Sequence, residues 1–210
     1  KNKIKVRTEE VNLKNILNRV LVNNLTALCD NPPTDVSSMD GYALNEKDYK
    51  KGKKLQVIGE SSAGHSSKKH IRPGCAIRIF TGAEIPKGAN KVILQENVKI
   101  LKNNKIKVNI DIDPNSQNIR IKGSDFLKGK KFKFEKFISP REILLLASMG
   151  HNKCEVFKKI KISIISIGNE LINPGEKNNS NKIFASNAYG IAGLLKNFSC
   201  DCNILPIVGD

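Results

Sequence analysis

Side chains that could act on a ligand gather in four short stretches of the chain. The first, "SSMDGYAL", places Asp40 before a glycine, in a bend that follows two prolines. The second, "RIFTGAEIPKGAN", leaves Thr81 where a predicted strand gives way to a long loop rich in glycine and proline. Loops carried by rigid strands often hold binding groups. An ordinary turn and an ordinary hairpin loop also explain these two stretches when each is taken alone.

The third and fourth stretches supply a cation and two carboxylates. In "NIRIKGSDFLKG", Arg120 could hold a phosphate or another oxyanion through two hydrogen bonds. Asp125 in the same stretch could bind Mg²⁺, which prefers a carboxylate together with phosphate oxygens. In "SIGNEL", Glu170 follows a predicted parallel strand, and ligands of open α/β sheets bind at that end. A solvated basic strand with an Asx turn, and a loop acid without a role, are the alternative interpretations.

Helices and short strands are predicted to position these side chains. Apolar residues at helical spacing predict an amphipathic helix over roughly residues 9–24. From about residue 55 to residue 110, short runs rich in β-branched residues, separated by turns, predict a small antiparallel β-module. Ser139 and Glu142 form a capping box, which predicts a helix that closes at Gly150.

The last part of the chain predicts the beginning of a parallel sheet. "KIKISIISIG" predicts a strand ending at Gly168, and "CNILPIV" predicts a second strand. Between them, Asn187–Asn197 is predicted to be a helix capped by Ser186. Strand, helix and strand form a βαβ unit, whose crossover implies parallel pairing. Because two strands do not complete such a sheet, we expect the chain to be a fragment or a truncated gene product.

The composition narrows the classes of function. The 210 residues carry 36 Lys and Arg against 20 Asp and Glu, a net charge of +16, which suits a nucleic-acid binder. The lysines are spread along the chain and aromatic residues make up only 5%, so surfaces for base stacking are scarce. An anionic small molecule fits the charge at least as well. Five irregularly spaced cysteines indicate neither a disulfide framework nor a zinc site, and favour a reducing cytoplasm. No apolar run approaches the roughly 20 residues of a membrane span.

In their combination and order, the stretches resemble the molybdopterin molybdenumtransferase family, which includes the bacterial MoeA proteins and the E domain of gephyrin. The matching segments are "SSMDGYA", "RIFTGAEIPKGAN" followed by Gln95-Glu96, "NIRIKGSD", "LLASMG" and "SIGNEL". They cover essentially the whole chain in register, which exceeds what chance produces.

The resemblance implies a multi-subdomain fold of the α+β and α/β classes. It implies an extended linker and dimer subdomain, an inserted β-rich module, and the incomplete start of a molybdopterin-binding-type parallel α/β domain. These parts would span residues 1–35 with 127–158, residues 36–126, and residues 159–210, respectively. Members of the family are elongated homodimers. Their active site lies in a cleft between the α/β domain of one subunit and the β-rich module of its partner.

The resemblance also implies an activity. The family inserts molybdate into adenylylated molybdopterin and releases AMP with Mg²⁺, which would make the chain a cytoplasmic transferase of molybdenum cofactor biosynthesis. Its partners would be a second copy, the small-molecule substrates, the molybdopterin adenylyltransferase and cofactor-accepting enzymes, with no nucleic acid and no membrane. Asp40, Thr81, Asp125 and Glu170 occupy catalytic positions and Arg120 a substrate-binding one. Asp125 and Glu170 would bind Mg²⁺, and Asp40 and Thr81 would line the cleft.

The chain departs from the family pattern at several positions. Ile167 stands where a threonine usually precedes Gly-(Asp/Asn)-Glu-Leu, and Ala185 replaces an acid before the next helix. Ile121 follows Arg120 where a second arginine is common. A decayed or truncated non-catalytic member of the family, and a scaffold or binding protein, are therefore alternative interpretations.

Overall fold

The structure is a computed structural model that describes residues 7–111, 113, 116–134, 137–177 and 182–210. The chain divides into two compact units. We call Ala27–Lys130 the inserted unit, and Lys1–Thr26 with Lys131–Asp210 the terminal unit. The division into three parts that the resemblance implies stays a prediction. Within the described ranges, neither helix has the length and apolar character needed to cross a membrane.

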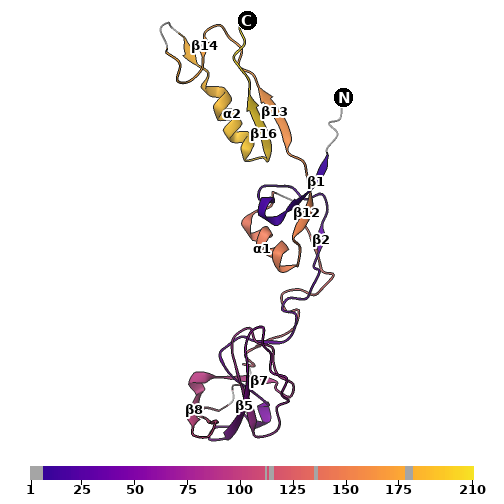
Figure 1. Ribbon diagram of the computed structural model, residues 1–210, viewed down its shortest axis with the longest axis vertical. Coiled ribbons are helices and arrows are strands. Elements are labelled where there is room, and N and C mark those ends of the chain that lie inside the picture. The colour runs from indigo at the N-terminus through magenta and orange to yellow at the C-terminus, as the bar shows by residue number, and fades with distance from the viewer. Residues whose placement is uncertain (1–6, 112, 114–115, 135–136, 178–181) are drawn as a thin grey trace. The chain divides into compact units, whose positions relative to one another are not determined.

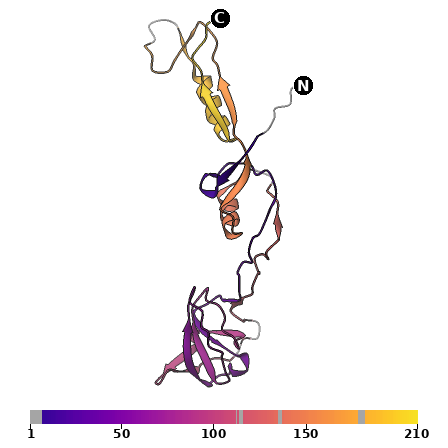
Figure 2. The same ribbon diagram turned by 45° about the vertical axis from the view of Figure 1, so that its right-hand side comes forward.

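A six-stranded sheet with the strand order β7-β4-β6-β5-β9-β8 dominates the inserted unit (Figure 2). Its strands are β4 (Gly41–Leu44), β5 (Lys54–Ser61), β6 (Cys75–Ile79), β7 (Lys91–Leu94), β8 (Val98–Leu101) and β9 (Lys105–Val108). The predicted strands are present, but β5 and β6 pair in parallel while the other neighbours are antiparallel. The prediction of an antiparallel module is wrong at this pair. Residues 62–74 form a long connection rather than a hairpin turn, which permits parallel pairing.

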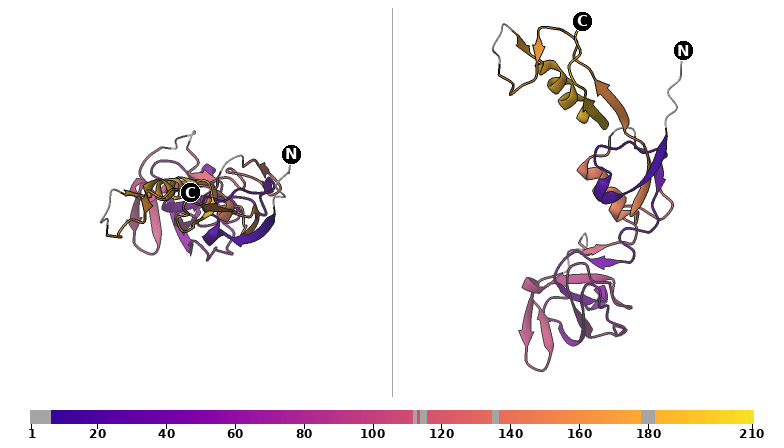
Figure 3. Two further views of the ribbon diagram at one scale, coloured as in Figure 1. Left: turned by 90° about the horizontal axis from the view of Figure 1, so that it is seen from above. Right: turned by 45° about the horizontal axis from the view of Figure 1, so that its top comes forward.

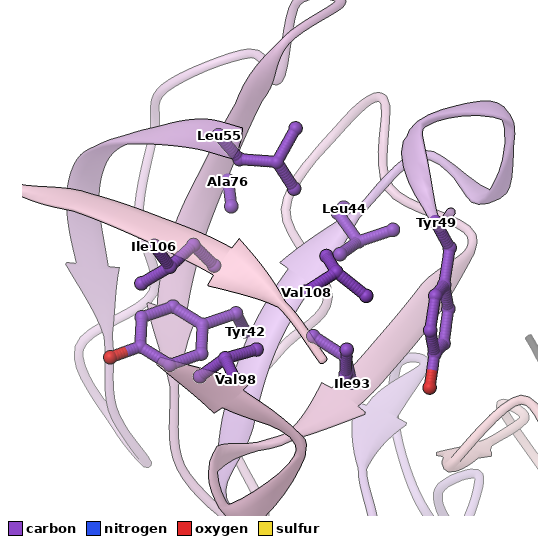
Figure 4. Close-up of a cluster of buried hydrophobic side chains, with 9 residues drawn as sticks. All are labelled: Tyr42, Leu44, Tyr49, Leu55, Ala76, Ile93, Val98, Ile106 and Val108. Atoms are coloured by element: carbon purple, nitrogen blue, oxygen red, sulfur yellow. The ribbon is translucent and has the colours of Figure 1, made fainter. Parts of the chain in front are cut away.

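Both faces of β4 are buried, because its side chains alternate between two hydrophobic clusters. Tyr42 and Leu44 pack with residues of β5, β8 and β9 in the cluster drawn in Figure 4. Ala43 packs with residues of β6 and β7 in a second cluster. Gly41 lies so close to β7 that an added Cβ would stand 1.9 Å from the Ile93 carbonyl oxygen. The start of β4, directly after Asp40, is therefore fixed by packing on both sides.

Shorter elements complete the inserted unit. They are β3 (Val36–Ser37), β10 (Ile119–Arg120), and the 3₁₀ turns η2 (Glu46–Asp48) and η3 (Gln95–Asn97). Strands β3 and β10 pair antiparallel. The pairing brings the stretch before Asp40 alongside the stretch that carries Arg120.

The first part of the terminal unit combines elements from the two chain segments that form it. These are β1 (Thr8–Asn12), η1 (Leu13–Asn15), β2 (Leu25–Thr26), β11 (Lys131–Phe132), α1 (Pro140–Ser148) and β12 (Lys153–Phe157). Strands β1 and β12 pair antiparallel and lie side by side in Figure 1, and β2 pairs with β11. Helix α1 carries the predicted capping box of Ser139 and Glu142, and Gly150 has the left-handed φ of 91°. The prediction of this helix is confirmed.

The predicted helix over residues 9–24 is wrong. Its first residues form β1, whose backbone pairs along its whole length with β12. Ile16 and Leu21 are buried together with Leu146 of α1 and Val156 of β12. Their helical spacing therefore reflects burial in a shared core rather than a helix. A strand partner far along the sequence outweighed a local periodic pattern.

The rest of the terminal unit contains the predicted βαβ arrangement. Its elements are β13 (Ile160–Ile164), β14 (Leu171–Ile172), β15 (Ile183–Phe184), α2 (Ser186–Lys196) and β16 (Cys200–Ile204). Strands β13 and β16 pair in parallel, with α2 beside them in the right-hand view of Figure 3. Two details of the prediction are wrong. The strand ends at Ile164 rather than at Gly168, and Ser186 is the first helical residue, since Ala185 occupies the N-cap position.

Candidate functional site

Asp40 and Thr81 meet at the end of two neighbouring strands. Asp40 directly precedes β4, and Thr81 lies just beyond the end of β6, which pairs antiparallel with β4. The backbone N–H and the hydroxyl of Thr81 both donate to Oδ1 of Asp40, each over 2.8 Å. Within the described residues, no protein group donates to the other oxygen, Oδ2. One oxygen thus fixes the carboxylate, and the second is free to accept a hydrogen bond from a ligand or water.

The hydrogen bonds set the charge of this carboxyl group. The pKa of Asp40 is lowered from its ordinary value of 3.8, mainly by the Thr81 N–H, then by the Thr81 hydroxyl. Desolvation opposes the shift, and the positive charge of Arg78 adds to it. Asp40 is therefore ionised near neutral pH. It can accept a proton or stabilise positive charge, and it does not serve as an acid there.

The strand β3 joins three of the four sequence stretches. Ile119 of β10 pairs with Ser37, and Arg120 pairs with Val36. On the other side, the Gly82 N–H donates to the Ser37 carbonyl over 2.8 Å, and the Ser37 N–H donates to the carbonyl of Ala83. The stretches around Asp40, Thr81 and Arg120 therefore belong to one hydrogen-bonded network, which their separation in the sequence does not show.

Arg120 and Asp125 form a close ion pair. Nη2 of Arg120 donates to Oδ1 over 2.9 Å and to Oδ2 over 2.8 Å, and both side chains are about half exposed. The turn that carries Asp125 is tied to an earlier segment, because the Gly123 N–H donates to Pro32 and Lys122 pairs with Asp30. The sequence predicted an anion-binding arginine and a metal-binding carboxylate. In the structure each group neutralises the other, so a ligand for either has to compete with this pair.

A hollow of about 510 Å³ lies beside Arg120 in the inserted unit. Arg120 and Glu84 are its charged residues, and Gly82, next to Thr81, forms part of its wall. The hydroxyl-bearing residues Thr34, Ser62 and Ser66 also line it. A polar, partly anionic small molecule matches such a lining better than an apolar one.

Glu170 belongs to the terminal unit, whereas the other four predicted site residues belong to the inserted unit. It is exposed in the loop between β13 and β14, and its carbonyl oxygen accepts the Ile183 N–H over 2.8 Å. A second hollow, of about 460 Å³, lies at the carboxyl end of β13 and the beginning of α2. The two departures from the family pattern, Ile167 and Ala185, both line it. The described part of the chain contains no group of three or more His, Cys, Asp or Glu side chains that could hold a metal ion.

Two residues outside the five predicted site residues, Arg78 and Gln95, surround the Asp40 bend. Arg78 of β6 donates to the Gly41 carbonyl and to the Gln95 side chain, and the Gln95 N–H donates to the Asp40 carbonyl. In the sequence, Arg78 is a basic residue in a strand, which is usually solvated. Its place three residues before Thr81 in "RIFTG" was the sequence signal that could have indicated it as a neighbour of the site.

The sequence also matches a known family. Residues 1–150 match the family described as the MoeA N-terminal region (domain I and II). The chain belongs to this family.

Individual relatives extend the similarity to the remaining residues. The chain is 33% identical over 204 residues to a molybdopterin molybdenumtransferase of Haemophilus influenzae, covering 95% of the chain and 50% of the relative. It is 30% identical over 209 residues to the molybdopterin molybdenumtransferase of a Nostoc species, covering 97% and 48%. A crystal structure of the molybdopterin biosynthesis moeA protein of Pyrococcus horikoshii OT3 matches with a TM-score of 0.85 and 33% identity. That match covers 97% of this chain and 55% of the other. The chain thus spans about half the length of these relatives.

Proposed function

We propose that the chain acts in molybdenum cofactor biosynthesis, as part of a molybdopterin molybdenumtransferase. The reaction would insert molybdate into adenylylated molybdopterin, with Mg²⁺-dependent release of AMP. The observation that carries the proposal is the ionised Asp40 carboxylate, held through one oxygen by Thr81 with the other oxygen free, in a chain of the MoeA family. A carboxylate fixed in this way can orient a donor group or a water molecule at the reacting bond.

Both proposed substrates are anions, so they repel one another and also repel Asp40. Arg120 would offset this repulsion by exchanging its partner. When its guanidinium turns from Asp125 to an anionic group of the substrate, the two oxygens of Asp125 become available. The net charge of +16 would favour the approach of both anions over a longer range.

Mg²⁺ fits the chemistry of the proposed donors. Asp125 and Glu170 offer carboxylate oxygens, and Mg²⁺ in proteins is commonly bound by one or two carboxylates with substrate phosphates and water. A cluster of three protein ligands is therefore not required. A bound Mg²⁺ would supply positive charge at the phosphates of the adenylate. Arg120 regulates this donor set, because both oxygens of Asp125 are engaged until the arginine leaves.

We further propose that the site is completed in a homodimer, by the inserted unit of one copy and the terminal unit of the other. In the cytoplasm, its partners would be the molybdopterin adenylyltransferase and the enzymes that accept the cofactor. Glu170 would then contribute from a different copy than Asp40. Mixed dimers of an Asp40→Asn chain and a Glu170→Gln chain test this arrangement, because one of their two sites would be intact and would restore part of the activity.

The activity is tested with the product of the complete reading frame that contains this chain. The protein is mixed with adenylylated molybdopterin, molybdate and Mg²⁺, and AMP is measured by chromatography. We expect release by the wild type and a loss of about 100-fold or more for Asp40→Asn. Glu46→Gln removes the same charge at an exposed residue and should leave the rate unchanged. No release by the wild type, where a relative releases AMP, would sink the proposal and favour a non-catalytic protein.

A further inference from the structure

Arg78 lies directly opposite Tyr42 in the antiparallel pairing of β6 with β4. Its Nη1 donates to the Gly41 carbonyl over 3.2 Å, and its Nη2 donates to Oε1 of Gln95 over 2.5 Å. Its Cζ lies 5.0 Å from the centroid of the Tyr42 ring and 4.9 Å from that of the Phe80 ring. The guanidinium is thus held by two hydrogen bonds and two aromatic rings.

These contacts surround the backbone of Asp40 from both sides. The Gly41 carbonyl belongs to the residue that follows Asp40, and the Gln95 N–H donates to the Asp40 carbonyl over 3.2 Å. Arg78 connects these two points, because it binds Gly41 and the side chain of Gln95 together. Tyr42 is buried in the cluster of Figure 4, so the arginine also ties the bend to the core.

We propose that Arg78 is a positioning residue that fixes the Asp40 bend, and so aims the free oxygen of Asp40 at the ligand. The effect of Arg78 on catalysis rests on the proposed function. Its effect on the position of Asp40 does not, and it can be measured without any substrate.

The contacts of Arg78 argue against a direct role in binding a substrate. Its two terminal nitrogens donate to protein oxygens, and two rings lie within 5.0 Å of its Cζ. Arg120, in contrast, is half exposed, and among the described residues its side chain donates to Asp125 alone, whose carboxylate a ligand can replace. A guanidinium that is hydrogen-bonded and stacked loses little entropy on holding its partners, which suits a rigid support.

The positive charge of Arg78 also favours the ionised form of Asp40, whose backbone its hydrogen bonds hold in place. The pKa of Asp40 is lowered first by the hydrogen bonds from Thr81, and the charge of Arg78 lowers it further. Removal of the guanidinium should therefore disturb the position of the carboxylate and raise its pKa together. A residue that only packs against Tyr42 would change the stability and leave this pKa unaltered.

The test uses isotope-labelled chains of wild type, Arg78→Met, Arg78→Lys and Arg72→Met. Arg72 is an exposed arginine of the same unit, so its replacement controls for the lost charge. The pKa of Asp40 is read from the carboxyl carbon in an NMR titration. Hydrogen exchange rates of the Thr81 and Gln95 amides show how firmly their hydrogen bonds to Asp40 are held. In Arg78→Met we expect a raised pKa and exchange at least about tenfold faster at both amides. Arg72→Met should match the wild type.

Arg78→Lys separates the two effects, because a lysine keeps the charge but cannot form the planar fork. We expect a pKa closer to the wild type, with faster exchange at the Gln95 amide. If Arg78→Met does not fold, the same measurements on Arg78→Lys decide. A folded variant in which the Asp40 pKa and both exchange rates equal those of the wild type would overturn the proposal.

The AMP assay adds the catalytic consequence. In Arg78→Lys we expect kcat to fall about tenfold while KM changes less than about twofold, because the arginine acts through Asp40. A rise in KM alone would indicate contact with the substrate and would overturn the positioning role. If the wild type releases no AMP, the proposed function fails, and the NMR measurements still decide whether Arg78 positions Asp40.

Discussion

The predicted site residues of the two units differ in what holds them. In the inserted unit, Asp40 is bonded to Thr81, and Arg120 is paired with Asp125. In the described part of the terminal unit, no protein group donates to the Glu170 carboxylate, which is exposed. The inserted unit is therefore preorganised before a ligand arrives, whereas no hydrogen bond from the described residues fixes the Glu170 carboxylate.

The surrounding sheets explain this difference. Strand β4 lies between β6 and β7 and is buried on both faces, so the residue before it has little freedom. Among the described residues, strand β13 pairs with β16 alone, and the loop after it begins with the exposed Ile165. A strand with two neighbours can fix the side chains at its end, and a strand with one neighbour fixes them less well. Substitutions at matched positions of the two units can break or sharpen this comparison.

The largest effect is expected for Gly41→Ala in the inserted unit. The new Cβ would meet the backbone of β7, with the carbonyl oxygen of Ile93 at 1.9 Å and its carbon at 2.9 Å. Backbone cannot move aside as a flexible side chain does, so β4 and β7 would have to separate. We expect a loss of about 3 kcal/mol or more in the free energy of unfolding, measured with urea.

Gly190→Ala is the matched change in the terminal unit. Gly190 lies within α2 and has open space where the Cβ would be placed. Alanine favours a helix over glycine by about 0.5–1 kcal/mol, so this variant should be slightly more stable. Equal losses in both variants would contradict the comparison, since they would show that the inserted unit is no more tightly constrained.

Thr81→Val should weaken the preorganisation without unfolding the unit. Valine keeps the backbone N–H bond to Asp40 and removes the hydroxyl bond. We expect the pKa of Asp40 to rise and AMP release to fall about tenfold, a typical consequence of losing one hydrogen bond to a charged group. Thr81→Ser retains the hydroxyl and should keep both values near those of the wild type. NMR titration measures the pKa, and an unchanged pKa in Thr81→Val would show that the hydroxyl bond is not formed.

The same bonds give a pH dependence of stability. Because the pKa of Asp40 is lower in the folded chain, its contribution is complete above the ordinary value of 3.8. The contribution is lost as the pH falls through the folded-state pKa. As the pH is lowered from about 5, the free energy of unfolding should therefore fall less in Thr81→Val than in the wild type. Urea unfolding at a series of pH values measures this slope, and an identical slope in both chains would contradict the assignment.

Secondary structure could be predicted from the sequence where residues close together along the chain determine it. The capping box at Ser139 and Glu142 needs only four residues, and it predicted the beginning of α1. The runs rich in β-branched residues likewise predicted the strands of the inserted unit. Thr8–Asn12 was assigned wrongly because its partner, β12, comes from residues 153–157, far along the sequence. The parallel pairing of β5 with β6 was missed for another reason: the runs of β-branched residues predict strands, but they do not show that the connection over residues 62–74 is a crossover rather than a hairpin turn.

The candidate site shows the same limit. The sequence supplied all five predicted residues, but not the relations among them. That Thr81 donates twice to Asp40, and that Arg120 occupies both oxygens of Asp125, depends on strands brought together by folding. Arg78 was missed because its partners, Gly41 and Gln95, come from other segments.

A smaller effect is expected for Ser139→Ala in the terminal unit. The substitution removes the hydroxyl that caps α1 and the bond it donates to Glu142, and it keeps the backbone N–H bond to Glu142. Loss of an N-cap typically costs about 1 kcal/mol. The free energy of unfolding should fall by this amount, and hydrogen exchange should accelerate in α1 but not at the Thr81 amide. Faster exchange at Thr81 would show that the two units are coupled, which would weaken the contrast between them.

The smallest effect concerns the outer face of the inserted unit. Lys54, Lys107 and Lys99 are in register on β5, β9 and β8, and all three are exposed. Directly opposite side chains in such pairs have Cβ atoms about 5 Å apart, within the screening length of about 8 Å in 0.15 M salt. Lys107→Gln removes the central charge and should raise the free energy of unfolding by about 0.2–1 kcal/mol at low salt. In 1 M salt the gain should disappear.

Lys87→Gln provides the control for this substitution, because Lys87 is an exposed loop residue outside the paired strands. Its replacement lowers the net charge equally but removes no lysine in register with others. A gain confined to Lys107→Gln would show that the inserted unit tolerates local repulsion on its outer face, because its two hydrophobic clusters hold the strands together. An equal gain in both variants would instead assign the effect to the net charge of the whole chain.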